Sequence, residues 1–150
     1  MEKKSAKLVF YAVFLLYLSA LLWILFNRSR YLEGIPYWQQ VRQYVNLQPF
    51  HTIRLYLRML FHPSLQVHTS LAWYNLLGNI LMFLPMGALV PMVFPRFRSF
   101  FRTMALALGF IILVEIVQVL LLAGSCDIDD VILNLLGCAL GYPFRQFLIP

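Results

Sequence analysis

Apolar residues fall into four long runs that are separated by polar segments. The first run, Leu8–Phe26, contains 19 residues and no charge, and about 20 apolar residues cross the hydrocarbon core of a bilayer. Similar runs at about 71–94, 103–123 and 131–149 predict three further crossings. The expected fold is therefore all-α: a polytopic membrane bundle of four transmembrane helices, formed by residues 1–150 as a single domain.

The polar segment between the first two runs contains one amphipathic element. Apolar residues from Phe50 to Phe61 recur at helical spacing, whereas His51, Arg54 and Arg58 occupy another face. A basic face beside an apolar one is typical of a helix that lies in the membrane interface. We therefore expect one interfacial helix in addition to the four crossings.

The composition excludes most soluble classes. The chain is 61% hydrophobic and 12% charged, whereas soluble domains carry about 25% charged residues. The net charge of +6 comes from 12 Lys and Arg against 6 Asp and Glu. Because these basic residues lie mostly at the ends of apolar runs, they indicate membrane orientation and anionic lipids, not nucleic acid. Their bias predicts that both termini are cytoplasmic. Cys126 and Cys138 are expected to be unpaired.

Polar residues within the apolar runs are predicted to gather in one leaflet. If the crossings alternate in direction, the last three runs bring their polar side chains to the same end of the bundle. These candidate site residues are Asn75, Asn79, Glu115, Gln118, Asp127, Asp129, Asp130 and Asn134. A carboxylate within a crossing is costly and indicates function, and we expect Asn79, Gln118 and Asn134 to donate to Glu115. The amides could instead bridge helices, and the aspartates could stabilise a helix N-terminus.

The acidic residues of this cluster also form a candidate metal site. Asp127, Asp129, Asp130 and Glu115 would supply oxygen ligands of the kind that Mg²⁺ or Ca²⁺ takes. Such a metal could bridge to a lipid-linked phosphate. The three histidines lie in the long polar segment and are expected to be interfacial, not catalytic: His51, His62 and His68.

Six short motifs in a fixed order resemble the VanZ-like family over about Asn46–Tyr142. They are Asn46-Leu-Gln-Pro-Phe50, Asn75-Leu-Leu-Gly-Asn79, Phe83-x-Pro85-x-Gly87, Glu115-Ile-Val-Gln118, Asp127-Ile-Asp-Asp130 and Asn134-x-x-Gly137-x-x-x-Gly141. The positions carried over from the family are all eight candidate site residues together with Pro85, Gly87 and Gly137. Pro85, Gly87, Gly137 and Gly141 are expected to shape and pack the helices.

This resemblance implies a small multi-pass protein of the bacterial plasma membrane. The founding member of the family is associated with low-level resistance to the lipoglycopeptide teicoplanin, without an altered peptidoglycan terminus. Many relatives have a basic or bulky apolar residue just before the first aspartate, whereas this chain has Ser125-Cys126 there.

Three functions are compatible with these patterns. The first is a non-enzymatic envelope protein that binds or redistributes an amphiphile or a lipid-linked cell-wall component in the outer leaflet, which would lower teicoplanin susceptibility. The second is a divalent-cation-dependent membrane enzyme acting on a phosphorylated lipid. The third is a small transporter or flippase that uses Glu115 as a proton-linked gate, and four crossings would require an oligomer for that role. Membrane lipids are the expected partners in each case.

Overall fold

The protein is helical apart from one short strand pair. The computed structural model describes residues 2–61 and 69–148. The elements are α1 (Glu2–Phe26), α2 (Tyr37–Gln43), β1 (Val45–Asn46), α3 (His51–Phe61), α4 (Thr69–Val93), the 3₁₀ helix η2 (Pro95–Phe97), α5 (Phe100–Leu120), β2 (Cys126–Asp127), α6 (Ile128–Gly141), the 3₁₀ helix η3 (Tyr142–Phe144) and α7 (Arg145–Leu148). His62 and His68 lie outside the described residues.

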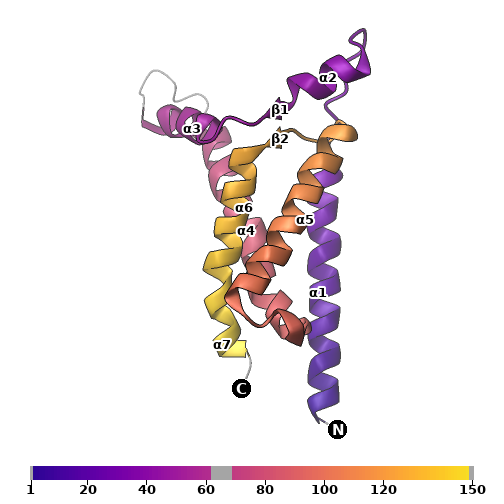
Figure 1. Ribbon diagram of the computed structural model, residues 1–150, viewed down its shortest axis with the longest axis vertical. Coiled ribbons are helices and arrows are strands. Elements are labelled where there is room, and N and C mark those ends of the chain that lie inside the picture. Colours follow the sequence, from indigo (N-terminus) through magenta and orange to yellow (C-terminus); the bar gives the residue numbers. More distant parts are fainter. Residues whose placement is uncertain (1, 62–68, 149–150) are drawn as a thin grey trace.

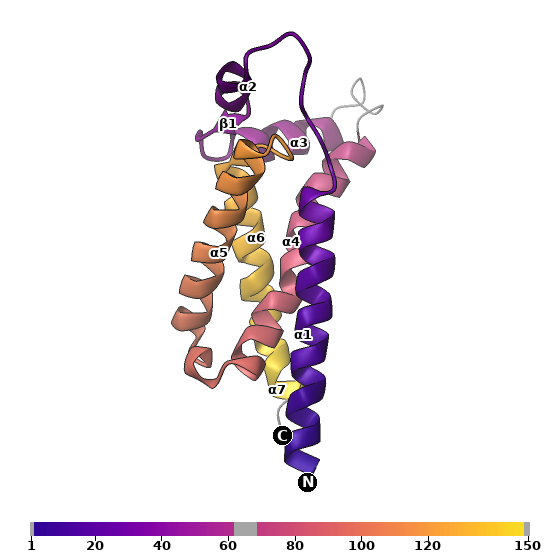
Figure 2. The ribbon, with the colours of Figure 1, turned by 90° about the vertical axis from the view of Figure 1, so that its right-hand side faces the viewer.

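The long helices run side by side, and the short elements cover one end of them. Figure 1 shows α2, α3, β1 and β2 at one end of the bundle, with both chain termini at the other. In Figure 2, α3 lies across the end of the bundle instead of along it. The acidic segment before α6 and the amphipathic helix therefore occupy the same end, which we call the α3 end.

Three helices in the described part of the chain are long and apolar enough to cross a membrane. They are α1 from Lys7 onward, α4 and α5, and α4 continues as one helix through Pro85 and Pro91. The structure does not contain the single helix over 131–149 that was expected as the fourth crossing. Its α-helix begins at Ile128 and ends at Gly141, and η3 with Pro143 then separates it from α7, because proline cannot donate the next helical hydrogen bond.

Helices α4 and α6 pack at backbone distance through three glycines. A Cβ atom at Gly137 would lie 2.2 Å from the carbonyl oxygen of Ile80, and one at Gly141 would lie 1.8 Å from that of Leu84. From the other side, a Cβ at Gly87 would lie 1.9 Å from the carbonyl oxygen of Cys138. Small residues allow this approach in membranes, where dispersion contacts replace the hydrophobic effect.

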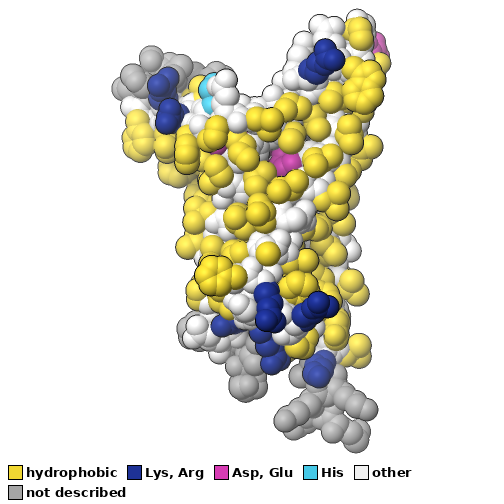
Figure 3. Space-filling model, in the orientation of Figure 1, with side chains coloured by type: hydrophobic (Ala, Val, Ile, Leu, Met, Phe, Trp, Pro, Cys, Tyr) yellow, Lys and Arg dark blue, Asp and Glu magenta, His cyan; other side chains and the backbone are white. Residues whose placement is uncertain are grey.

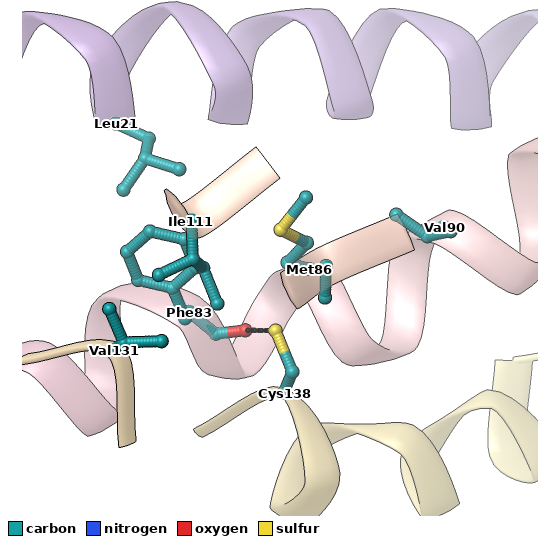
Figure 4. Packing of buried hydrophobic residues seen from close by; sticks show 8 residues of the cluster. Leu21, Phe83, Met86, Val90, Ile111, Val131 and Cys138 are labelled. Atoms are coloured by element: carbon teal, nitrogen blue, oxygen red, sulfur yellow. Dashed lines mark hydrogen bonds between the residues drawn. The ribbon is translucent and has the colours of Figure 1, made fainter. Parts of the chain in front are cut away.

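The apolar core lies between these two helices and their neighbours. Phe83, Ile111 and Leu21 come from α4, α5 and α1 and are almost fully buried. Figure 4 shows them together, with the Cys138 thiol donating to the Phe83 carbonyl oxygen at 3.4 Å. Cys126 and Cys138 are both free, as expected.

The outer surface is mostly apolar between two charged ends. Figure 3 shows hydrophobic side chains along the shaft and Lys or Arg side chains gathered at both ends. Helix α3 has no fully buried residue, and Phe61 and Phe50 are 80% and 49% exposed. Exposed apolar side chains on a helix that lies across the end of a membrane bundle suit the interface that the sequence predicted.

The fold places Ser29 at the α3 end and both Ser99 and Gln146 at the other. With Cys126→Ser and Cys138→Ala as background, a single cysteine at position 29 should react with a membrane-impermeant maleimide from the opposite side to cysteines at 99 and 146. Labelling of intact and permeabilised cells measures this. Equal labelling of positions 29 and 99 would contradict a crossing by α4, and labelling of 146 together with 29 would contradict a crossing by α5 or by α6 to α7.

Candidate functional site

A two-stranded parallel pairing organises the α3 end. Val45 of β1 pairs with Cys126 of β2, and Asn46 pairs with Asp127. The amide of Cys126 also donates to the Tyr44 carbonyl oxygen at 2.8 Å. The segment that leads into α3 is therefore held against the start of α6, although about 80 residues separate them in the sequence.

The side chain of Asp129 caps the first turn of α3. Its Oδ1 accepts a hydrogen bond from the amide of Phe50 at 2.6 Å, and its Oδ2 accepts one from the amide of Ile53 at 3.0 Å. The amides of a first helical turn lack partners within their own helix, and a carboxylate there is also favoured by the helix dipole. Phe50 has a φ of 61°, so this bond holds a residue in a left-handed conformation that costs about 1–2 kcal/mol.

Asp127 joins the same two segments. Its Oδ1 accepts from the amide of Asp129 at 2.9 Å and so caps α6. Its Oδ2 accepts from the hydroxyl of Thr52 at 2.6 Å and from the side-chain amide of Asn46 at 3.1 Å. Asp127 and Asp129 are 6% and 0% exposed, so both carboxylates serve as buried acceptors that connect α3 to α6.

This arrangement does not support the predicted cation site. In the part of the chain that the structure describes, no group of three or more His, Cys, Asp or Glu side chains could hold a metal ion. The physical reason is that five donors from α6, β1, α3 and the residue before α3 already occupy Asp127 and Asp129. Only Glu115 and Asp130 of the four predicted ligands line a common space.

That space is a cavity of about 380 Å³ at the α3 end of the bundle. Its walls come from all four long helices and from the segments that follow α1 and α5. The polar and charged side chains that line it are Arg28, Arg30, Tyr74, Asn75, Asn79, Glu115, Gln118, Ser125, Asp130 and Asn134. Six of the eight predicted site residues are thus brought together, and Asp127 and Asp129 are not among them.

The two acids of the cavity have different partners from those expected. Glu115 is 3% exposed, and its Oε2 accepts from the backbone amide of Asp127 at 3.2 Å, not from a side-chain amide. Asn79 donates to Asp130 Oδ1 at 2.6 Å and so joins α4 to α6. Each carboxyl group therefore accepts one hydrogen bond from the described residues, and both residues line the cavity.

Gln118 and Asn75 both donate to backbone carbonyl oxygens. Gln118 donates to the carbonyl oxygen of Leu25 at 2.9 Å, which ties α5 to the last turn of α1. Asn75 donates to the Leu71 carbonyl oxygen of its own helix at 2.8 Å. Both side chains line the cavity, and each uses one of its two amide N–H donors in these bonds. Gln118 thus acts as a bridge between helices.

Asn134 has an unsatisfied acceptor. The residue is 2% exposed and lines the cavity, yet its Oδ1 has no hydrogen-bond partner among the described residues. A buried polar atom without a partner costs about 1–3 kcal/mol. Among the described residues, this is the one buried side-chain oxygen or nitrogen without a hydrogen-bond partner.

Two arginines at the rim of the cavity were not predicted as site residues. Arg28 and Arg30 follow the end of α1, and Arg30 lies 5.7 Å from the centre of the Tyr44 ring. Burial raises the pKa of the Tyr56 hydroxyl, the charge of Asp130 raises it further, and Arg30 lowers it. In the sequence, the only signal for these arginines was their position directly after the first apolar run.

The basic residues of α3 form a separate feature. His51, Arg54 and Arg58 line a hollow of about 230 Å³ together with Gln48, Pro49 and Leu55.

Burial raises the pKa of the Cys126 thiol, and the nearby charge of Glu115 raises it further. A protonated thiol is a weak nucleophile, so Cys126 offers no reactive group beside the cavity.

Comparison with protein families identifies the chain. The family model described as VanZ/LLP1 matches residues 14–148, which is nearly the whole sequence. The chain belongs to the VanZ/LLP1 family. Searches of the curated proteins and of the solved structures found no match. VanZ/LLP1 membership extends the resemblance from the motifs between Asn46 and Tyr142 to α1 as well, and together with three apolar helices it makes this a membrane protein.

In this VanZ/LLP1 protein, Asp129→Ala should lower the free energy of unfolding by about 3 kcal/mol, because two buried amides lose a charged acceptor and such bonds contribute about 1.5–3 kcal/mol each. Asp129→Asn retains one acceptor oxygen and should cause a smaller loss. Thermal unfolding in detergent micelles, followed by circular dichroism, measures both. The matched control is Glu33→Ala, which removes an exposed acid. A melting temperature for Asp129→Ala equal to that of the control would refute the capping role.

Proposed function

We propose that this VanZ-like protein binds or redistributes an amphiphile in the outer leaflet of the bacterial plasma membrane. The amphiphile is a lipid or a lipid-linked envelope component. By holding it, the protein reduces access of a lipoglycopeptide such as teicoplanin to the cell envelope. The observation that carries the proposal is a polar cavity and an apolar groove on the outside of α4 that share two lining residues, Tyr74 and Gly78.

The groove has a volume of about 430 Å³ and follows one side of α4. It is lined by Ser70, Trp73, Tyr74, Leu77, Gly78 and Leu81. Tyr74 and Gly78 also line the polar cavity. A headgroup in the cavity and an acyl chain in the groove would thus meet at Gly78, where a Cβ atom would have no neighbour within 4 Å.

The size of the cavity supports a headgroup as its occupant. A volume of about 380 Å³ corresponds to roughly a dozen water molecules at about 30 Å³ each. Sites for small ligands begin at about 300 Å³ and are usually larger. The cavity therefore suits the polar part of one lipid, so the proposed effect on the antibiotic acts through the lipid.

Orientation and the fourth crossing are part of the proposal. The segment from α6 to α7 covers residues 128–148, which at about 1.5 Å per residue is roughly 30 Å and matches the hydrocarbon core. Lys7, Arg96, Arg98, Arg102 and Arg145 belong to the end opposite α3, and positive charge near short loops favours the cytoplasmic side. The α3 end then faces outward. Reaction of the position-29 cysteine in intact cells supports this orientation, and reaction of that at position 99 contradicts it.

The enzyme alternative required a bound cation, and the occupied carboxylates of Asp127 and Asp129 remove the geometry that suggested it. Among the described residues, no group of three or more His, Cys, Asp or Glu side chains could hold a metal ion. Binding is the function that the remaining polar groups favour.

Glu115→Gln should leave the melting temperature close to that of the wild type and abolish protection against teicoplanin. The neutral amide oxygen can still accept from the Asp127 amide, so the internal hydrogen bond survives, whereas the carboxyl group that lines the cavity is lost. The minimum inhibitory concentration of teicoplanin in a Gram-positive host measures protection, with vancomycin as the comparison drug. Full protection by the Gln variant would return Glu115 to a purely structural role.

Gly78→Leu should retain stability but lose protection and most of the co-purifying lipid. The leucine side chain can enter the open space at this position and would separate the cavity from the groove. Gly109→Leu is the matched control, because Gly109 also has no neighbour within 4 Å of its Cβ position and lines neither space. Lipid retained after purification is measured by mass spectrometry. If both variants lose lipid equally, the loss is unspecific and the route past Gly78 is wrong.

A further inference from the structure

We infer that the headgroup bound in the cavity is zwitterionic and carries a primary ammonium group together with a phosphate. This inference rests on the proposed function and names the chemical class of its ligand. It follows from which donors and acceptors of the cavity remain without partners, and from where the two kinds of charge lie.

The acceptor side of the cavity is formed by α5 and α6. Asn134 Oδ1 is buried and has no partner among the described residues. Glu115 Oε1 and Asp130 Oδ2 accept no hydrogen bond from this part of the chain, since the bonds to these carboxylates reach Oε2 and Oδ1. Three acceptors on neighbouring helices match the three N–H donors of one ammonium group.

The donor side is formed by the segment after α1. Arg28 and Arg30 line the same cavity. Guanidinium groups bind phosphate with paired hydrogen bonds, and they do so better than other cationic side chains because their donors form a fixed planar fork. The cavity is therefore lined by two guanidinium groups and two carboxyl groups.

This distribution distinguishes between classes of headgroup. An anionic head without an amine would satisfy the arginines but would leave Asn134 and both carboxylates without donors. A choline head carries positive charge but has no N–H group to donate to Asn134. A phosphate and a primary ammonium joined by a short linker can satisfy both sides at once, as in phosphatidylethanolamine.

The test compares three lipids with the same short acyl chains. Purified full-length protein in detergent is titrated with dioctanoyl phosphatidylethanolamine, phosphatidylcholine and phosphatidylglycerol while its melting temperature is recorded, because a ligand of the folded state raises stability by mass action. We expect the affinity for phosphatidylethanolamine to exceed that for each of the other two lipids by about tenfold or more, a difference typical of one good polar contact.

Two variants connect this preference to the cavity. Asn134→Leu removes the unsatisfied acceptor at similar volume, so the ligand-free protein should melt at or above the wild-type temperature while the preference for phosphatidylethanolamine falls several-fold. Gln39→Leu, an exposed amide-to-leucine change on α2, is the control and should retain the preference. If Asn134→Leu fails to fold, Glu115→Gln provides the same comparison.

The outcomes separate the two levels of the argument. Tighter binding of phosphatidylglycerol, equal binding of all three lipids, or a preference that survives both cavity variants overturns the zwitterionic headgroup and leaves lipid binding in place. Absence of any stabilisation by the three lipids overturns the inference and the proposed function together.

Discussion

The arrangement of the bundle depends on the backbone contact between α4 and α6. Carbonyl oxygens of Ile80 and Leu84 occupy the space that side chains would fill at Gly137 and Gly141, so the two helices can neither rotate nor slide without a collision. That contact fixes their relative depth, and Asp130 consequently lies within 2.6 Å of the Asn79 amide. The other long helices close the cavity around this pair, with Gln118 reaching the last turn of α1.

The acidic residues before and within α6 divide between two tasks. Asp127 and Asp129 satisfy amides and a hydroxyl that would otherwise be buried without partners, and they hold α3 across the end of the bundle. Glu115 and Asp130 face the cavity, each with one internal partner. Because Asp127 and Asp129 make the connection between α3 and α6, the carboxyl groups of Glu115 and Asp130 are not used in it. They therefore remain available to a ligand of the kind proposed.

A polar space within a membrane helix bundle is costly unless something occupies it. The cavity combines arginines at the rim, carboxylates on its inner wall and an unpaired amide oxygen with an apolar groove beside it. A molecule that is polar at one end and apolar at the other satisfies all of these features at once. A soluble ion would leave the groove unused, and a purely apolar chain would leave Asn134 without a donor.

The sequence alone determined the membrane class, the three long apolar helices and the amphipathic helix, because apolar runs and helical periodicity are local properties of the chain. It also placed the polar residues at one end, since alternating crossings require only their order along the sequence. Which carboxylate meets which donor depended on tertiary structure: Asp129 bonds to amides 76 and 79 positions away, and no spacing rule covers such a distance. The same holds for Arg28, Arg30 and Gly78, whose roles appeared only once α1 and α4 lay against the cavity. Only the packing of α4 on α6 decided that Asp127 and Asp129 connect α3 to α6 while Asp130 and Glu115 line the cavity.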